Sequence, residues 1–201
     1  VMIADPVTRT PVRVAAVEAL GRLKLPDGVA ILLQASGDPD DTVRLKAIRS
    51  LGQIGDKRAT GLLSLLVREP KLQLMSIVAL GEIGDTAALP VLLRLVKAES
   101  TPREVLEKAF WALGSIKGDS TASALRGFLE ATDTQLISWT CDALGRVGSE
   151  ASIQPLIDTL NNEDEEVKKM AAWALQKITG VNLGTDLARW EKWYFARQEQ
   201  R

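Results

Sequence analysis

The chain contains 201 residues, of which 46% are hydrophobic and 25% charged, a composition that is ordinary for a soluble globular protein. Its 25 basic and 26 acidic residues leave a formal net charge of −1, which provides no global positive field for nucleic acid. Histidine, the commonest general base and metal ligand, is absent. We therefore expect no nucleic-acid partner, no metal, no cofactor and no catalytic residues.

The single cysteine, Cys141, cannot form an internal disulfide, which is compatible with the cytosol. No apolar run approaches the roughly 18 residues that a membrane span needs, and no signal peptide is recognisable. The chain starts at Val1 and reads as a piece of a longer protein, so missing signals say little about targeting. The cytoplasm is slightly favoured as the compartment, and a monomer is expected.

One short stretch, Ala79-Leu80-Gly81-Glu82-Ile83-Gly84-Asp85, recurs in altered form along the chain. Its leucine has counterparts at intervals of about 30 residues, namely Leu20, Leu51, Leu113, Leu144 and Leu175. A fixed period of this length is typical of stacked repeats, in which each unit contacts only its neighbours. The expected units are residues 1–25, 26–55, 56–84, 85–117, 118–148 and 149–180.

Each unit divides into two helical segments whose apolar residues recur at offsets of three and four. In chain order, the predicted first helices are 28–36, 58–68, 87–98, 120–131 and 151–161. The predicted second helices are 11–24, 42–54, 71–83, 103–116, 134–147 and 165–178. Only Val1 to Asp5 precede the breaker Pro6, so the first unit is expected to lack a complete first helix.

The pattern resembles HEAT repeats in their short bacterial form. The resemblance rests on the Ala-Leu-Gly-x-Ile endings, on the Gly-Asp turns and on Pro90 and Pro155 in first helices. It also rests on the Asp-x-Val-Arg run at 41–44, whereas Gln176 departs from the pattern by replacing the glycine. The resemblance implies an all-α fold, a right-handed α-α superhelix of about six helical hairpins with a C-terminal capping helix. It also implies a binding scaffold, the commonest function in the family.

The tail, residues 181–201, follows a different pattern. Asp186 is a candidate N-cap, and Leu187, Trp190, Trp193 and Tyr194 follow it on one face of a final helix. The end of a repeat stack exposes an apolar face, which needs a cap that is apolar inside and polar outside. We predict such a cap, with an exposed aromatic docking site as the alternative.

Three features could carry chemistry, and each has a plainer interpretation. Cys141 occupies a position that is apolar in the other units, which predicts a buried, inert thiol. Acidic residues cluster at 38–41 and at 163–166, just before second helices, where carboxylates favour the helix N-terminus. Capping is the favoured interpretation of both clusters, and a weak calcium or magnesium site is the alternative.

The most informative positions lie on the second helices, which line the concave surface of HEAT-like stacks. Residues one and four before each motif leucine are small and allow close packing, so residues two, five and six before it should point outward. Collected along the chain, these positions give an apolar and aromatic stripe: Leu74, Met75, Val78, Trp111, Trp139, Met170 and Trp173. Charged residues flank it, among them Arg49, Lys108, Asp142, Arg146 and Lys177.

An exposed apolar patch with a charged rim usually marks a binding site. We therefore predict a non-catalytic scaffold that binds a peptide or partner helix along the concave face. The alternatives are a HEAT-like bilin lyase, a DNA glycosylase-type enzyme, or a purely structural module of a longer protein. If the tryptophans filled grooves between repeats instead, replacing Trp111 and Trp173 with Ser would unfold the protein; we expect helical circular dichroism and melting to stay nearly unchanged.

Overall fold

The computed structural model describes residues 9–199, and all regular elements within that range are helical. The chain divides into two compact units, Val1–Ala112 and Leu113–Arg201, called unit 1 and unit 2 below. The boundary falls inside helix α7 (Arg103–Ser115). The predicted all-α class of stacked helical hairpins is confirmed. The short segment Val1 to Asp5, predicted to replace a first helix, lies outside the described residues.

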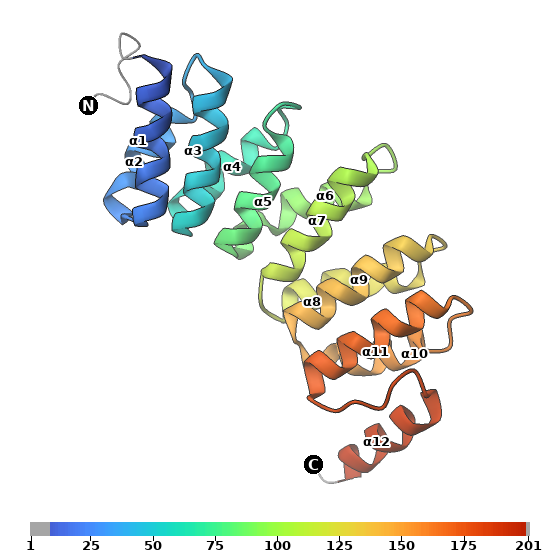
Figure 1. The fold of residues 1–201 in the computed structure, drawn as a ribbon. Helices are drawn as coiled ribbons and strands as arrows, with labels where there is room; N and C mark the ends of the chain where they lie inside the picture. Colours follow the sequence, from blue (N-terminus) through green and yellow to red (C-terminus); the bar gives the residue numbers. More distant parts are fainter. Residues whose placement is uncertain (1–8, 200–201) are drawn as a thin grey trace. The chain divides into compact units, whose positions relative to one another are not determined.

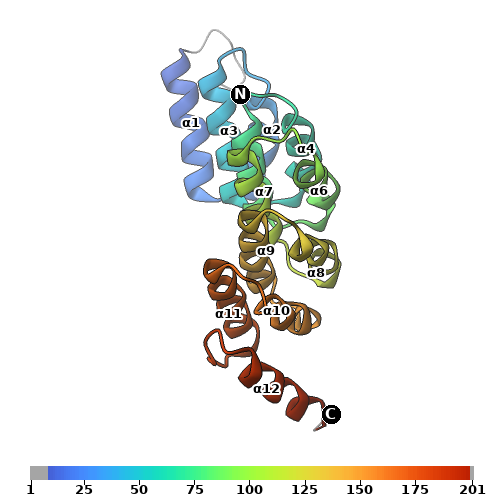
Figure 2. The ribbon, with the colours of Figure 1, turned by 90° about the vertical axis from the view of Figure 1, so that its right-hand side faces the viewer.

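Unit 1 has two layers of helices (Figures 1 and 2). The second helices α1 (Thr10–Leu23), α3 (Asp41–Ile54) and α5 (Gln73–Ile83) lie side by side in one layer. The first helices α2 (Val29–Ala35), α4 (Thr60–Leu66) and α6 (Leu89–Lys97) form the other layer. Each first helix follows a 3-10 turn, which is η2 (Pro26–Gly28), η3 (Lys57–Ala59) or η4 (Thr86–Ala88).

Unit 2 repeats the arrangement and ends in the tail helix. The second helices α9 (Thr134–Val147) and α11 (Glu165–Thr179) pack against each other. Behind them lie α8 (Asp119–Arg126) with its 3-10 extension η5 (Gly127–Glu130), and α10 (Ile153–Thr159) after η6 (Glu150–Ser152). Helix α12 (Leu187–Glu199) packs on α10.

The first helices are shorter than the sequence pattern predicts. The predicted helix 58–68, for example, begins as the 3-10 turn η3 and becomes α-helical only at Thr60. Asp56 caps this turn, because its carboxylate accepts from the backbone N–H of Arg58 at 2.9 Å. The Asp56 carbonyl then accepts from Ala59 N–H at 3.1 Å, the tighter bonding of a 3-10 turn.

The Ala-Leu-Gly motif sets how closely successive second helices approach. A methyl group placed on Gly81 would lie 2.8 Å from the Cα of Ala112, and one on Gly145 would lie 2.9 Å from the Cα of Ala174. The glycine of one repeat therefore receives the alanine of the next, which leaves no room for a side chain. Gln176 occupies the glycine position in the sixth repeat and is exposed, and the tail helix α12 follows this repeat in the chain.

The tail helix buries one aromatic ring and is joined by an ion pair to η6, the turn before α10. Trp190 is fully buried, and its indole N–H donates to the carbonyl of Gly184 at 2.8 Å. Arg197 lies over the ring of Trp193 and pairs with Glu150 at 2.5 Å. Phe195, in contrast, is 64% exposed. The tail is thus apolar toward unit 2 and mainly polar outside, as a cap requires.

The acidic clusters act as helix caps and ion-pair partners. Asp40 accepts from the N–H groups of Thr42 and Val43, and Asp164 accepts from those of Glu166 and Val167. The capping prediction is confirmed for both. Within residues 9–199, no group of three or more acidic or cysteine side chains could hold a metal ion, and no helix is long and apolar enough to cross a membrane.

Candidate functional site

The seven residues of the predicted stripe are divided between the two units. Leu74, Met75 and Val78 lie on α5 and Trp111 on α7, all in unit 1. In unit 2, Trp139 lies on α9, and Met170 and Trp173 lie on α11. All seven are half-buried, so none belongs to the fully exposed large apolar side chains of the described chain. That the seven form one binding stripe stays a prediction.

Two of the tryptophans lie on the backbone of the preceding second helix. A methyl group on Gly81 would be 2.5 Å from Cζ3 of Trp111, and one on Gly145 would be 2.8 Å from Cζ3 of Trp173. Part of each ring therefore fills the space over a motif glycine, while the rest of the residue keeps partial exposure. This packing changes our expectation for the Ser substitutions, because removing either ring uncovers a closely packed helix contact.

Trp173 also borders an open hollow of about 530 Å³ on the second-helix face of unit 2. Its lining residues are Gly114, Ser115, Lys117, Asp142, Gly145, Arg146, Trp173 and Lys177. The Lys177 ammonium lies 5.6 Å from the centre of the Trp173 ring, within cation–π range. Cationic side chains outnumber acidic ones here, since Asp142 is the only carboxylate in the lining.

Two of the cations of this hollow, Arg146 and Lys117, donate hydrogen bonds to neutral groups. Arg146 donates to the hydroxyl of Ser115 at 2.8 Å and lies 3.7 Å from the carboxylate of Asp142. The Lys117 ammonium donates to the carbonyl of Arg146. The structure thus brings together three of the predicted rim residues, Asp142, Arg146 and Lys177, around one aromatic side chain.

The other two predicted rim residues lie in unit 1. Lys108 pairs with its neighbour Glu107 at 2.8 Å on α7 and lines none of the hollows described here. Arg49 lines a small hollow of about 180 Å³ together with Glu18, Arg22, Lys46, Ser50 and Gln53. The carboxylate of Glu18 pairs with Lys46 at 2.6 Å, and this ion pair holds the pKa of Glu18 below its ordinary value.

Beside it lies a larger hollow of about 470 Å³, lined by Gly21, Arg22, Lys24, Gly52, Gln53 and Glu82. These residues were missed as binding candidates, because only positions before the motif leucines were considered in unit 1. The position two residues after the leucine is occupied by Arg22, Gln53 and Glu82 in unit 1, and by Arg146 and Lys177 in unit 2. The same helical periodicity that gave the stripe could therefore have identified this set.

Glu82 reaches back over the preceding helix, as Trp111 and Trp173 do. A methyl group on Gly52 would overlap Oε2 of Glu82, so the carboxylate occupies the space above this glycine. Burial raises the pKa of Glu82, although the nearby charges of Arg49 and Lys24 act in the opposite direction. Glu82 as a whole stays exposed, and it shares this face with Arg22, Lys24 and Arg49 and with the carboxylate of Glu18.

Cys141 fits its predicted structural role. It lies on α9 and is fully buried, and burial raises the pKa of its thiol to about 12. A thiol with so high a pKa is almost entirely protonated near neutral pH, so it is a poor nucleophile.

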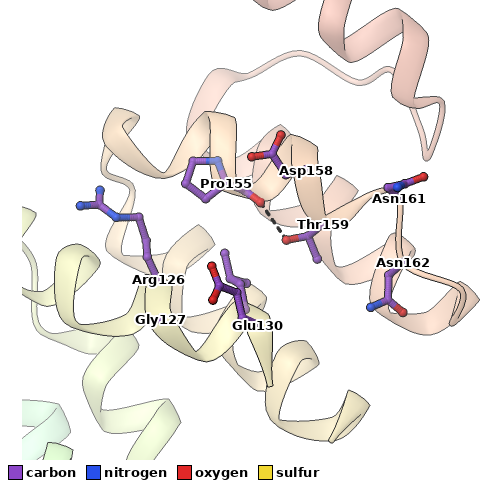
Figure 3. A pocket seen from close by; sticks show the side chains of 9 residues that line it. Arg126, Gly127, Glu130, Pro155, Asp158, Thr159, Asn161 and Asn162 are labelled. Carbon is purple, nitrogen blue, oxygen red and sulfur yellow. Dashed lines mark hydrogen bonds between the residues drawn. The ribbon is translucent and has the colours of Figure 1, made fainter. Parts of the chain in front are cut away.

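A further hollow of about 540 Å³ lies on the first-helix side of unit 2 (Figure 3). Arg126 and Pro155 stand at one end and Asn161 and Asn162 at the other, with Glu130 and Thr159 between them. Several of these side chains already have partners: Thr159 donates to the Pro155 carbonyl at 2.8 Å, and Arg126 to the Ala151 carbonyl at 3.1 Å. The hollow therefore offers fewer unoccupied polar groups than its size suggests.

Comparison with known proteins gives a family match over most of the chain. The profile of the family described as HEAT repeats matches residues 8–69, 59–140 and 128–188. The comparison with curated proteins gave no match.

Solved structures of repeat proteins share the fold at low sequence identity. The complex of CpcE and CpcF of phycocyanin lyase from Nostoc sp. PCC7120 is 22% identical, with a TM-score of 0.59 over 88% of this chain and 75% of that one. Computationally designed armadillo repeat proteins for modular peptide recognition are 15% identical, with a TM-score of 0.53 over 89% and 98%. The archaeal HEAT-like repeats protein from Thermococcus onnurineus NA1 is 14% identical, with a TM-score of 0.54 over 90% and 79%.

Proposed function

Because the chain belongs to the HEAT-repeat family, we propose that it is a non-catalytic scaffold that binds a peptide or a partner helix through its second-helix faces. The observation that carries this proposal is the hollow of unit 2, where a half-buried tryptophan is surrounded by cations. Trp173 offers a flat apolar surface, and Lys177 and Arg146 stand beside it. Aromatic and arginine side chains together are the favoured chemistry of binding hot spots.

The geometry supports an extended or helical segment rather than a small substrate. The hollow is open, and the Trp173 ring that lines it lies over Gly145. The polar groups around Trp173 can bind the side chains or the main chain of a partner. The histidine-free sequence and the buried, protonated Cys141 support a role without catalysis.

Selection of peptides from a random display library on the whole chain, followed by affinity measurements, tests this function. We expect Trp173→Ser and Lys177→Gln each to weaken the selected peptides by about tenfold, since each removes one hot-spot contact. Phe195→Ser is the matched control, because Phe195 is an exposed aromatic on α12 outside the hollow. Lys177 is exposed, so its variant should fold even if Trp173→Ser destabilises the chain.

The functions that the sequence left open would give different results. Retention of the chain on heparin or DNA at low salt would favour the nucleic-acid enzyme, because such binding depends on phosphate contacts. A change in the absorption spectrum on mixing with a bilin would favour the lyase. Selected peptides whose affinity is unchanged by Trp173→Ser and by Lys177→Gln would contradict the proposed site.

A further inference from the structure

The second-helix face of unit 1 carries a cluster of cations. Arg22 and Lys24 line the larger hollow together with Glu82, and Arg49 lines the adjoining smaller one. We propose that this cluster binds the carboxylate side chains of an acidic polypeptide segment. The proposal rests on the scaffold function, and it names the chemical class of the partner at a site separate from the aromatic hollow of unit 2.

Lys24 is the first argument for a binding role. It ends α1 in the left-handed conformation, with φ 49° and ψ 40°, and is the only non-glycine residue with positive φ between residues 9 and 199. Three other repeats have a glycine with positive φ at the same position, four residues after the motif leucine: Gly55, Gly84 and Gly148. The left-handed backbone conformation is strained for lysine but not for the glycines of these repeats, and such strain is found most often at functional positions.

The second argument is that these cations are not held in direct ion pairs, although Glu18 and Glu82 lie close enough to interact with them. Between residues 9 and 199, the structure records no ion pair for Arg22, Lys24 or Arg49. Other cations of the same unit are paired, as Lys46 is with Glu18 and Lys71 with Asp41. Three unpaired cations on one face leave a positive potential that an acidic segment would neutralise.

The third argument concerns the acceptors on the same face, which favour polypeptide over nucleic acid. The carboxylate of Glu82 and the side-chain amide of Gln53 stand in the hollow beside Arg22 and Lys24. Both can accept a hydrogen bond from a main-chain N–H, which a peptide provides and a phosphate backbone does not.

Fluorescence anisotropy with a labelled oligoglutamate peptide, measured on the whole chain at low salt, tests the proposal. A labelled oligoglutamine peptide is the uncharged control probe. The double variant Arg22→Gln with Arg49→Gln should weaken oligoglutamate binding by about tenfold. Arg94→Gln is the matched control variant, because Arg94 is an exposed arginine of unit 1 on the first helix α6.

The variant Lys24→Gly distinguishes a binding role of Lys24 from a purely structural role. Glycine adopts positive φ without strain, so this variant should raise the melting temperature of the chain. The same variant should weaken oligoglutamate binding by about threefold, because it removes one of three cations. A gain of thermal stability together with a loss of binding supports the proposal. Unchanged binding in both Lys24→Gly and the double variant overturns it.

Further measurements distinguish an acidic peptide from phosphate and DNA as the ligand, and distinguish the site in unit 1 from the site in unit 2. Inorganic phosphate that displaces the peptide at low millimolar concentration, or a DNA oligonucleotide that binds more tightly and depends on the same arginines, overturns the assignment to an acidic segment. If peptides from the display library depend on Trp173 and Lys177 while oligoglutamate fails to bind, the scaffold function stands and this inference is wrong. If oligoglutamate binds as expected and no library peptide depends on Trp173 or Lys177, this inference stands and the proposed site in unit 2 is wrong.

Discussion

The repeats of unit 1 and those of unit 2 are joined by different chemistry. In unit 1, ion pairs cross from one repeat to the next: Arg13 to Asp38, Glu18 to Lys46, Asp41 to Lys71, and Arg44 to Glu69. In unit 2, the Trp173 ring lies on Gly145, Lys117 donates to a backbone carbonyl, and Ser149 donates to Asp119. The same motif thus sets the approach of the backbones in both units, and in each a tryptophan lies over a motif glycine, Trp111 over Gly81 and Trp173 over Gly145. The ion pairs add a sensitivity to charge to the joints of unit 1.

The largest effect is expected from the buried ion pair of unit 1. Arg13 and Asp38 are each 5% exposed, and two hydrogen bonds of 2.8 Å join the guanidinium to the carboxylate. Arg13→Ala should lower the free energy of unfolding by about 3 kcal/mol, because it leaves a buried carboxylate without its cation. Chemical denaturation measures the change, and Lys46→Ala, which breaks the half-exposed pair with Glu18, should cost under about 1 kcal/mol. Equal losses in the two variants would contradict the distinction between buried and exposed joints.

A smaller effect is expected from the shape-sensitive joint of unit 2. Gly145→Val places a branched side chain where Trp173 and the backbone of Ala174 already lie within 3 Å of any added methyl group. We expect a loss of about 2 kcal/mol, because the helices must separate or the ring must leave its place. Gln176→Val is the control at the equivalent position of the last repeat, where the side chain is exposed and a change within about 0.5 kcal/mol is expected. A Gly145→Val variant as stable as this control would show that the ring moves away freely.

The smallest expected effect is a difference between the two units in their sensitivity to acid. Burial alone would raise the pKa of Asp38, but hydrogen bonds from Arg13 and from the Asp40 N–H outweigh it and hold the pKa below its ordinary 3.8. The Lys71 ammonium likewise lowers the pKa of Asp41, with help from Arg44. Since the folded-state pKa values lie below the unfolded ones, this stabilisation is complete above the ordinary value and is lost as pH falls through the folded values.

Hydrogen exchange at decreasing pH, corrected for intrinsic exchange rates, measures this difference unit by unit. Protection of α1 and α3 should fall as the pH approaches and passes below 3.8. In the variant Asp38→Asn, the fall in protection of α1 should be shallower, because one titrating group has been removed. A pH dependence of α1 identical in the variant and the parent chain would show that Asp38 does not contribute.

Sequence periodicity was sufficient for the repeat architecture but insufficient for the joints between repeats. The predicted helix 134–147 matches α9, and 42–54 differs from α3 by one residue, because both have an aspartate cap and a motif ending. The pairing of Arg13 with Asp38 could not be predicted, because it depends on how segments 25 residues apart in the chain are placed against each other. The position of Trp173 over Gly145 has the same cause.

The candidate sites were predictable to a similar extent. The offset of four residues accounts for the common position of Asp142 and Arg146, since residues on one helix keep a fixed geometry, whereas Lys177 joins them from α11. Helical offsets did not indicate how deeply Trp173 is buried, which depends on the neighbouring helix. Lys24 was recognisable in the sequence, because it replaces the turn glycine of other units, but its strained backbone needed the structure.

The buried Cys141 is a built-in probe of local opening of the chain. It is the only cysteine in the sequence, so a thiol reagent has a single target. Because the side chain is fully buried on α9, alkylation requires that helix to open locally or the whole unit to unfold. The labelling rate in the native protein, compared with that in denaturant, would therefore give the free energy of this opening without any engineered probe.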